Sequence, residues 1–165
     1  QRPKRTVLTV CAMRILSGRR ISFEPMPIEI YRRTLERGTR PGTDIHDLTD
    51  EIRLVVSESG VEDGLLLVSV PGSTAAVTTI EFEPGAVADL TAAIERLAPE
   101  DIDYEHDRRW VDGNGFSHVR AALMGPSAAF PIAAGEIEVG TWQQIVLCDF
   151  DNRPRTRRIV VQVMG

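Results

Sequence analysis

The feature that most constrains the fold is a short, continuous apolar run over residues 64–70. It reads Gly-Leu-Leu-Leu-Val-Ser-Val and is followed directly by Pro71-Gly72. Such a run is typical of a strand with both faces buried, so we expect it at the centre of a sheet. Residues 75–82 then alternate between more and less apolar side chains, which is the period of a strand. The Pro71-Gly72 turn between them predicts a hairpin.

Three stretches show the apolar spacing of helices. The first begins near Thr49, where a side chain can accept a backbone N–H, and Gly60 can end it. The second covers residues 85–97, with Pro84 at its start. The third covers residues 116–124 and is followed by a glycine.

The rest of the chain is divided between a basic N-terminal segment and short strands. Residues 1–27 contain Pro25-Met26-Pro27 and predict an arm, either extended or disordered. A first strand is expected over residues 28–35, and the chain beyond residue 125 alternates short strands with turns. Strands mixed with two or three helices, without regular βαβ units, predict one α+β domain over residues 28–165.

Composition argues against several classes of function. A formal net charge of −5 and a pI near 5.2 are unlike those of a dedicated nucleic-acid binder. No apolar run approaches the ~20 residues of a membrane-spanning helix, and no small-residue cleavage site follows the basic start. Cys11 and Cys148 are spaced neither as a zinc site nor as a disulfide scaffold, which favours a reducing cytoplasm. We therefore expect a cytoplasmic protein without nucleic-acid or membrane partners.

A polar segment over residues 99–115 has no regular period and contains His106, Asp107, Asp112 and Asn114. His118 follows it at the start of the third predicted helix. Imidazole and carboxylate groups are suitable ligands for a divalent metal, and a loop with the following helix could bring them together. Two histidines twelve positions apart could equally have capping or surface roles, and the spacing alone favours that interpretation.

Two other groups of polar residues could bind an anion. Ser73 and Thr74 could offer hydroxyl and backbone N–H groups to it, although small polar residues in a turn more often stabilise the turn itself. A compact arginine group could hold phosphate, or could form a solvated strand edge. Its members are Arg153, Arg155, Arg157 and Arg158.

Neither cysteine lies beside a histidine, and the chain contains no nucleophile elbow, Walker loop or dinucleotide-binding glycine fingerprint. Nucleophilic catalysis is therefore not indicated. Trp142 and Gln143 are expected on a strand that begins at Gly140, with Trp142 in the core or at a subunit interface.

Several ordered motifs resemble those of the YjbQ-like family over about residues 28–165. The segments that carry the resemblance are Thr49-Asp50-Glu51-Ile52, the run over residues 64–70, Ser73-Thr74-Ala75-Ala76, Tyr104-Glu105-His106-Asp107, residues 112–118, residues 120–127, Gly140-Thr141-Trp142-Gln143 and Arg155-Thr156-Arg157-Arg158. Gly140-Thr141-Trp142-Gln143 together with the ordered histidine segments is the most specific part of the match.

The resemblance implies a compact mixed-sheet sandwich that assembles as a homotrimer, with a polar site near the histidines. Family members are described as secondary thiamine-phosphate synthases, which join a pyrimidine diphosphate to a thiazole phosphate and release pyrophosphate, normally with a divalent metal such as zinc or magnesium. On this hypothesis a phosphorylated small molecule is the ligand. The roles that the hypothesis assigns are metal binding to His106 and His118, proton transfer to Glu81 or Asp107, and substrate binding to Ser73, Thr74, Gln143 and Arg157.

The chain departs from the family pattern at Gly72, where relatives usually have a histidine, and at Phe116, where some have a histidine or another polar residue. Glycine offers no side-chain ligand, so His46, Glu81, Asp107 or water would have to replace it. The alternative hypothesis is therefore a non-catalytic trimer that binds a metal or a metabolite.

Overall fold

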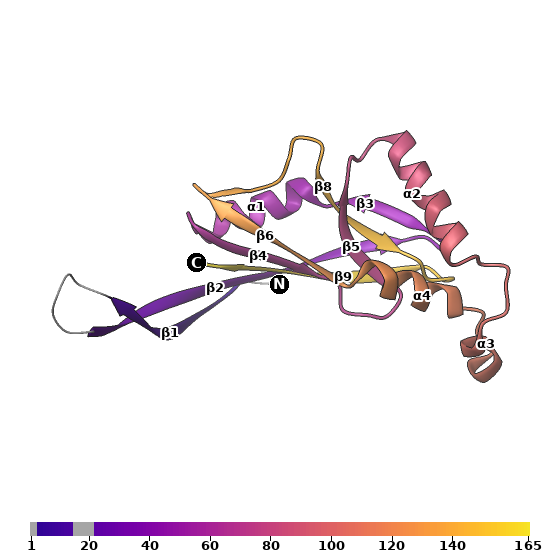
Figure 1. The fold of residues 1–165 in the computed structure, drawn as a ribbon, viewed down its shortest axis with the longest axis horizontal. Coiled ribbons are helices and arrows are strands. Elements are labelled where there is room, and N and C mark those ends of the chain that lie inside the picture. The colour runs from indigo at the N-terminus through magenta and orange to yellow at the C-terminus, as the bar shows by residue number, and fades with distance from the viewer. Residues whose placement is uncertain (1–2, 15–21) are drawn as a thin grey trace.

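The structure, a computed structural model, describes residues 3–14 and 22–165 and has an α+β fold (Figure 1). Two antiparallel sheets form its centre: a large sheet with strand order β1-β2-β9-β4-β6-β7 and a small sheet with order β3-β8-β5. The helices are α1 (Thr49–Ser59), α2 (Pro84–Leu97), α3 (Glu105–Trp110) and α4 (Gly115–Met124), and the strands are β1 (Lys4–Arg14), β2 (Ser22–Thr39), β3 (Asp44–Asp47), β4 (Gly64–Ser69), β5 (Ala75–Ile80), β6 (Ser127–Ala133), β7 (Glu136–Ile137), β8 (Gln144–Asp149) and β9 (Arg155–Met164).

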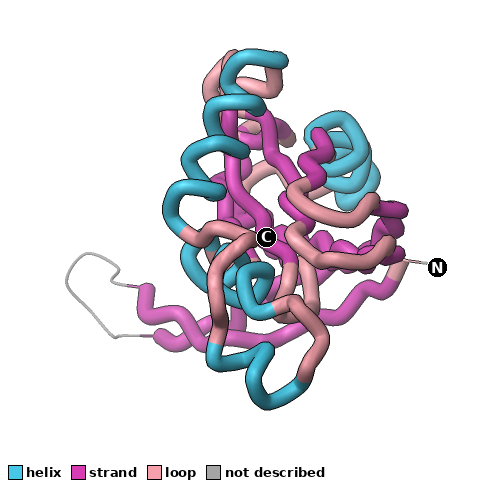
Figure 2. The backbone as a smooth tube through the Cα atoms, turned by 90° about the vertical axis from the view of Figure 1, so that its right-hand side faces the viewer, coloured by secondary structure: helices cyan, strands magenta, loops and turns pink. Residues whose placement is uncertain are grey.

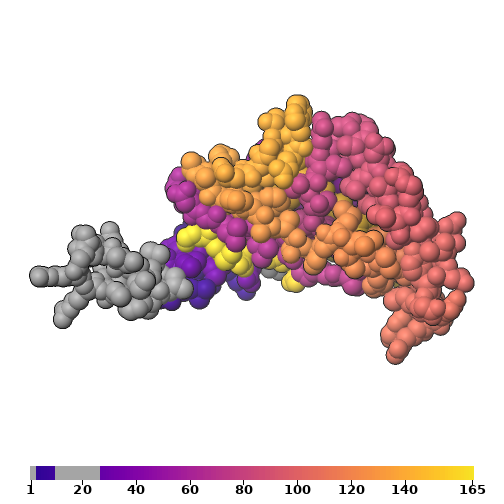
Figure 3. Space-filling view, in the orientation of Figure 1, coloured from indigo at the N-terminus to yellow at the C-terminus, as the bar shows by residue number. Residues whose placement is uncertain are grey.

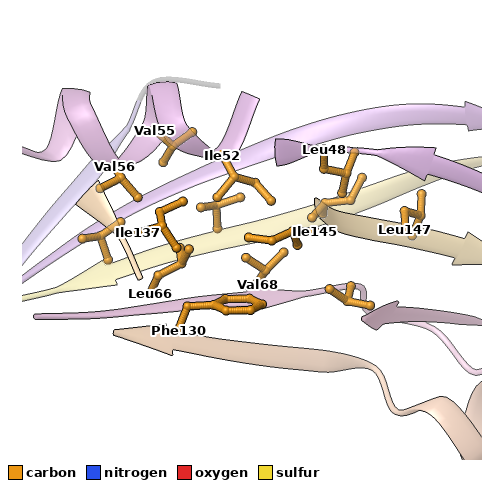
Figure 4. Close-up of a cluster of buried hydrophobic side chains, with 14 of the residues drawn as sticks. Leu48, Ile52, Val55, Val56, Leu66, Val68, Phe130, Ile137, Ile145 and Leu147 are labelled. Atoms are coloured by element: carbon orange, nitrogen blue, oxygen red, sulfur yellow. The ribbon is translucent and has the colours of Figure 1, made fainter. Parts of the chain in front are cut away.

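The main hydrophobic core lies between the large sheet on one side and α1 with the small sheet on the other. Figure 4 shows Ile52 and Val56 of α1 directed toward Leu66 and Val68 of β4, with Ile145 of β8 beside them. All five side chains are buried. This packing fixes the position of the small sheet relative to the large one.

The opposite face of the small sheet is covered by α2 and α4. Ala76, Val146 and Cys148 pack there against Ile94 of α2 and Ala121 of α4. Figure 2 shows α2 on the side of the molecule away from α1. The small sheet is therefore an inner layer, with the large sheet and α1 packed on one face and with α2 and α4 packed on the other.

The helices confirm most of the sequence-based expectations. α1 begins where Asp47 accepts the backbone N–H of Thr49 at 2.8 Å, and it ends at Gly60, whose φ of 71° is readily adopted by glycine. Pro84 occupies the first turn of α2. α3 is an additional short helix inside the polar segment. It projects from the end of the molecule opposite the β1–β2 hairpin (Figures 1 and 3).

Two expectations about strand packing were wrong. β4 and β5 do not form a hairpin, because β4 pairs with β6 and β9 in the large sheet whereas β5 pairs with β8 in the small one. Residues 71–74 therefore cross between sheets. β4 is also buried on one face only in the single chain, since Leu65 is 40 % exposed while Leu66 is fully buried.

Trp142 is not on a strand, and it is not in the core of the chain. Residues 140–143 form a turn, with the Gln143 N–H bonded to the Gly140 carbonyl at 3.0 Å, and β8 begins only at Gln144. Trp142 is 71 % exposed. An interface role for it stays a prediction.

At the N-terminus, β1 and the first part of β2 form a long hairpin that projects from the body (Figure 1). The arm expected over residues 1–27 includes residues 1–2 and 15–21, which lie outside the described residues. β2 continues through residue 28 and pairs with β9 from Ile30 onward.

Candidate functional site

Most of the polar residues singled out in the sequence meet at one end of the small sheet. Ala75, the first residue of β5, pairs with Asp149, the last residue of β8, and Asp149 pairs on its other side with Asp44 of β3. Residues 71–74 and the turn after β8 therefore lie at the same end. α4 packs beside β5 and places its histidine there.

His118 of α4 lines a shallow pocket of about 220 Å³, together with residues that include Gly72, Ser73, Ala75, Ala121 and Pro126. The side chain of His118 makes no hydrogen bond to any described residue, and it is partly exposed. Both ring nitrogens are therefore available to a ligand in the pocket.

His106 of α3 lies beside His118, with ring centroids 4.4 Å apart and ring planes tilted by 34°. Its Nδ1 is 3.4 Å from Oδ1 of Asp107 and 3.4 Å from Oδ1 of Asp112. Each of these three residues offers a ligand atom within 4.8 Å of the others. One imidazole and two carboxylates form a donor set suited to a divalent cation such as Zn²⁺, Mn²⁺ or Mg²⁺.

Asp107 also shapes the loop that follows α3. Its Oδ1 accepts the backbone N–H groups of Asn114 and Gly115, each at 2.9 Å, whereas its Oδ2 accepts no hydrogen bond from the described residues. Burial alone would raise the pKa of Asp107, but the bonds from Gly115, His106 and Asn114 outweigh it and hold the pKa below its usual value. Asp107 is thus an ionised carboxylate with one oxygen left for a cation or a proton.

The glycine at the start of α4 is required by close packing. A Cβ on Gly115 would lie 2.4 Å from Cβ of Tyr104, so α4 could not approach α3 as it does with a larger residue. This contact helps to bring His118 beside His106.

A buried network of charged groups lies beneath residues 71–74. Arg157 of β9 donates from Nε and Nη2 to the two oxygens of Asp149, at 2.6 and 2.7 Å, and Nη2 also lies 2.8 Å from Oγ1 of Thr74. Thr74 in turn donates to Oδ2 of Asp151 at 2.9 Å. Arg155 bonds the same carboxylate, with Nε 2.9 Å from Oδ2. A guanidinium fork held by two buried carboxylates is a rigid arrangement.

The pKa of Asp151 reflects this network. Burial would raise it, but the hydrogen bonds from Arg155 and Thr74 and the charge of Arg155 hold the pKa below its usual value. The turn after β8 is fastened to the α3–α4 loop as well, since Asn152 donates from Nδ2 to the Asp112 carbonyl at 2.7 Å and from its backbone N–H to Oδ1 of Asn114 at 3.1 Å. The histidines and the buried network are thereby held as one unit.

Three of the predicted site residues lie elsewhere. Glu81 follows the far end of β5 and is exposed. Gln143 lies at that same far end, where its Nε2 is 3.3 Å from Oγ1 of Thr79. His46 of β3 is bonded through Nε2 to Oδ2 of Asp44 at 2.8 Å. Of the three side chains considered as replacements for a histidine at position 72, only Asp107 lies with His106.

Asp149 and Asp151 belong to the site but were not predicted from the sequence. Their signal was two carboxylates at the end of an otherwise apolar strand, followed within eight residues by Arg155 and Arg157 on the next strand. Cys148, next to them, is fully buried, and burial raises the pKa of its thiol to about 12, so it is inert as a nucleophile.

Comparison with known proteins decides the family. A family model described as "UPF0047 protein YjbQ-like" matches residues 33–165. The chain belongs to the UPF0047 (YjbQ-like) family. The match begins within β2, so β1 and the first part of β2 precede it.

Individual relatives agree with this assignment. A UPF0047 protein of Archaeoglobus fulgidus is 37% identical over 126 residues, which cover 76% of this chain and 95% of the relative. One from Mycobacterium bovis is 40% identical over 116 residues, covering 70% of this chain and 87% of the relative. The crystal structure of a "YbjQ-like protein of unknown function" from Sulfolobus solfataricus aligns with a TM-score of 0.80 and 29% identity, covering 84% of this chain and 99% of the other.

The α+β fold is thus shared with solved UPF0047 structures, as the sequence predicted. In the described part of the chain, no helix is both long and apolar enough to cross a membrane.

Proposed function

We propose that this UPF0047 protein binds a divalent metal through His106, Asp107 and Asp112, with His118 beside them, and uses it to hold a phosphorylated small molecule. The single observation that carries the proposal is the convergence of three metal-type ligands next to a pocket-lining histidine that is free to bind. A bound cation would supply charge stabilisation to phosphate oxygens.

The candidate reaction is that of a secondary thiamine-phosphate synthase, as the resemblance implies. A bond forms between the pyrimidine and thiazole units while the bond to the diphosphate breaks, and pyrophosphate leaves with the bonding electrons. Such a leaving group needs cationic and hydrogen-bonding partners. Ser73, Thr74 and Arg157 would supply them from the chain itself. Asp107 has no proton-transfer role in this proposal, because Oδ1 accepts two backbone N–H groups and the remaining oxygen would bind the metal.

Glu81 and Gln143 have no part in this proposal, because both lie at the far end of β5. The donor set also differs from three histidines, since Gly72 offers no ligand and Phe116 is buried without a polar group. Two carboxylates in place of imidazoles favour harder cations, so we expect Mg²⁺ or Mn²⁺ to compete well with Zn²⁺.

The second candidate is a non-catalytic homotrimer that binds a metal or a metabolite. The absence of a side chain at Gly72 favours it, because one ligand of the family pattern is missing. A metal-binding trimer predicts the same metal content as the enzyme but no reaction, whereas a trimer that binds only a metabolite predicts no metal. Light scattering tests the trimer separately, since a monomer in solution would contradict it.

The test is elemental analysis of the purified full chain after reconstitution with each metal, for the wild type, His106→Ala and His46→Ala. We expect about one metal per chain in the wild type and in His46→Ala, and its loss in His106→Ala without a change in melting temperature. His46→Ala is the matched control, because it removes an imidazole outside the cluster.

Equal metal content in all three proteins would overturn the proposed site. If the metal-loaded wild type then yields no thiamine phosphate from a pyrimidine diphosphate and a thiazole phosphate, the binding trimer replaces the enzyme.

A further inference from the structure

The loop between the two sheets, residues 71–74, presents a row of hydrogen-bond donors. The backbone N–H groups of Gly72, Ser73 and Thr74 donate to no other described residue. Gly72 and Ser73 are exposed, so water satisfies their groups and an anion can replace that water. No acidic residue occurs between residues 64 and 80 to repel such an anion.

Arg157 adds a donor to this row. Its side chain is only 9% exposed, and its Nε and Nη2 are occupied by Asp149 and Thr74. Its Nη1 donates to no described residue. This nitrogen is not enclosed, so water reaches it in the free protein and an anion can replace that water.

Gly72 is the residue next to that nitrogen. A Cβ added at Gly72 would lie 3.4 Å from Nη1 of Arg157. Any side chain there would fill part of the space from which an oxygen could approach to about 2.8 Å, the length of a charge-assisted hydrogen bond. Because Gly72 has a φ of +144°, a side chain would also strain the loop and redirect its N–H groups.

We propose that Gly72 opens an anion subsite that binds a phosphate group between Nη1 of Arg157 and the free N–H groups of Gly72 and Ser73. Gly72 is thus a specificity-determining residue, since its lack of a side chain gives the phosphate access to the arginine. This proposal deepens the proposed function, because it names the part of the ligand held at this end of the site, but it requires no metal.

The charges around the subsite set the expected strength of binding. Arg155 and Arg157 are balanced by Asp149 and Asp151, so the phosphate gains directional hydrogen bonds more than net attraction. A tetrahedral oxyanion can use several donors at once, whereas a planar carboxylate can use fewer. We expect millimolar affinity for inorganic phosphate, and weaker binding of acetate.

The experiment is a titration of the full chain with inorganic phosphate in the presence of a chelator, followed by amide nuclear magnetic resonance. We expect the signals of Gly72, Ser73 and Thr74 to shift on phosphate addition. In Gly72→Ala the affinity should fall about tenfold, the effect of losing a charged hydrogen bond. Gly60→Ala is the control, since Gly60 also has a positive φ, of 71°, but its Cβ would meet nothing within 4 Å.

Unshifted loop signals in the wild type, or equal affinity in Gly72→Ala and the wild type, would overturn the subsite. The wild-type shifts decide the question even if the variant does not fold. Because the chelator removes metal, failure here leaves the metal proposal standing, and failure of metal binding leaves this one standing.

Discussion

The two ends of β5 have similar polar residues in the sequence, yet only one end resembles a site. At the start of β5, Thr74, Asp149 and Arg157 are buried and bonded to one another. At the far end, Glu81 is exposed and Gln143 makes a hydrogen bond of 3.3 Å to Thr79. Residue type alone therefore does not distinguish a site. A site is distinguished by the burial of its polar side chains, by their convergence at one place and by a hydrogen-bond donor that has no partner among the described residues.

The difference follows from the sheet topology. At the start of β5 the chain crosses between sheets, so β9 of the large sheet contributes Arg157 next to residues of the small sheet. At the far end β3 leads into α1 and β5 leads into α2, and none of the ion pairs among the described residues joins Glu81 to the large sheet. A site forms where two layers and two helices meet, because several elements can direct side chains into one volume.

The largest expected effect comes from removing the buried positive charge at the start of β5. Arg157→Met should lower the free energy of unfolding by about 3–5 kcal/mol, because Asp149 loses its cationic partner while still buried, whereas Asp151 keeps Arg155. Gln143→Ala, at the far end, should change it by less than about 1 kcal/mol. Urea unfolding at neutral pH measures both, and similar losses in the two variants would contradict the contrast between the ends.

A smaller effect is expected from acid, through Asp44, which pairs with Asp149 across β3 and β8. Burial would raise the pKa of Asp44, but hydrogen bonds from the side chain and backbone of Arg40 and from His46 lower it from 3.8 to about 2. A carboxyl group with a lowered pKa stabilises the folded state at pH values above its pKa in the unfolded chain. That stabilisation is lost as the pH falls from about 4 to about 2.

The wild type should therefore lose about 2 kcal/mol across that pH range through Asp44 alone. Asp44→Asn should show a correspondingly shallower decline. Asp50→Asn, whose side chain is 98% exposed in the wild type, is the matched control and should decline like the wild type. Parallel curves for Asp44→Asn and the wild type would show that Asp44 is not held as the structure has it.

Local patterns in the sequence predicted those elements that depend on local physics. α1, α2 and α4 have apolar stripes with recognisable ends, such as Pro84 and Gly60, and each was expected within a few residues. α3 was missed because its six residues, Glu105–Trp110, are nearly all polar and none is buried. Its position depends on packing against α4 at Gly115, which no local pattern reveals.

Long-range pairing accounts for the remaining errors. The alternation in residues 75–80 predicted a strand correctly but could not say that its partner is β8 instead of β4. The same limit applies to the site. His106, His118 and Asp107 lie within thirteen residues and were grouped correctly, whereas Glu81 was included and Asp149 omitted because sequence separation does not indicate which strand ends meet.

The smallest expected effect tests the boundary between the metal cluster and the anion subsite. Gly72→His places an imidazole at the rim of the pocket that His118 lines, and in doing so fills the space beside Nη1 of Arg157. Metal affinity should rise about tenfold from the added ligand, while phosphate affinity should fall by a similar factor, each equivalent to ~1.4 kcal/mol. Glu81→His adds the same imidazole at the far end of β5 and should change neither affinity. Opposite changes of the metal and phosphate affinities in Gly72→His would show that position 72 can provide either a third imidazole for the metal or access of phosphate to Arg157. Changes of both affinities in the same direction would mean that metal and phosphate occupy one shared site.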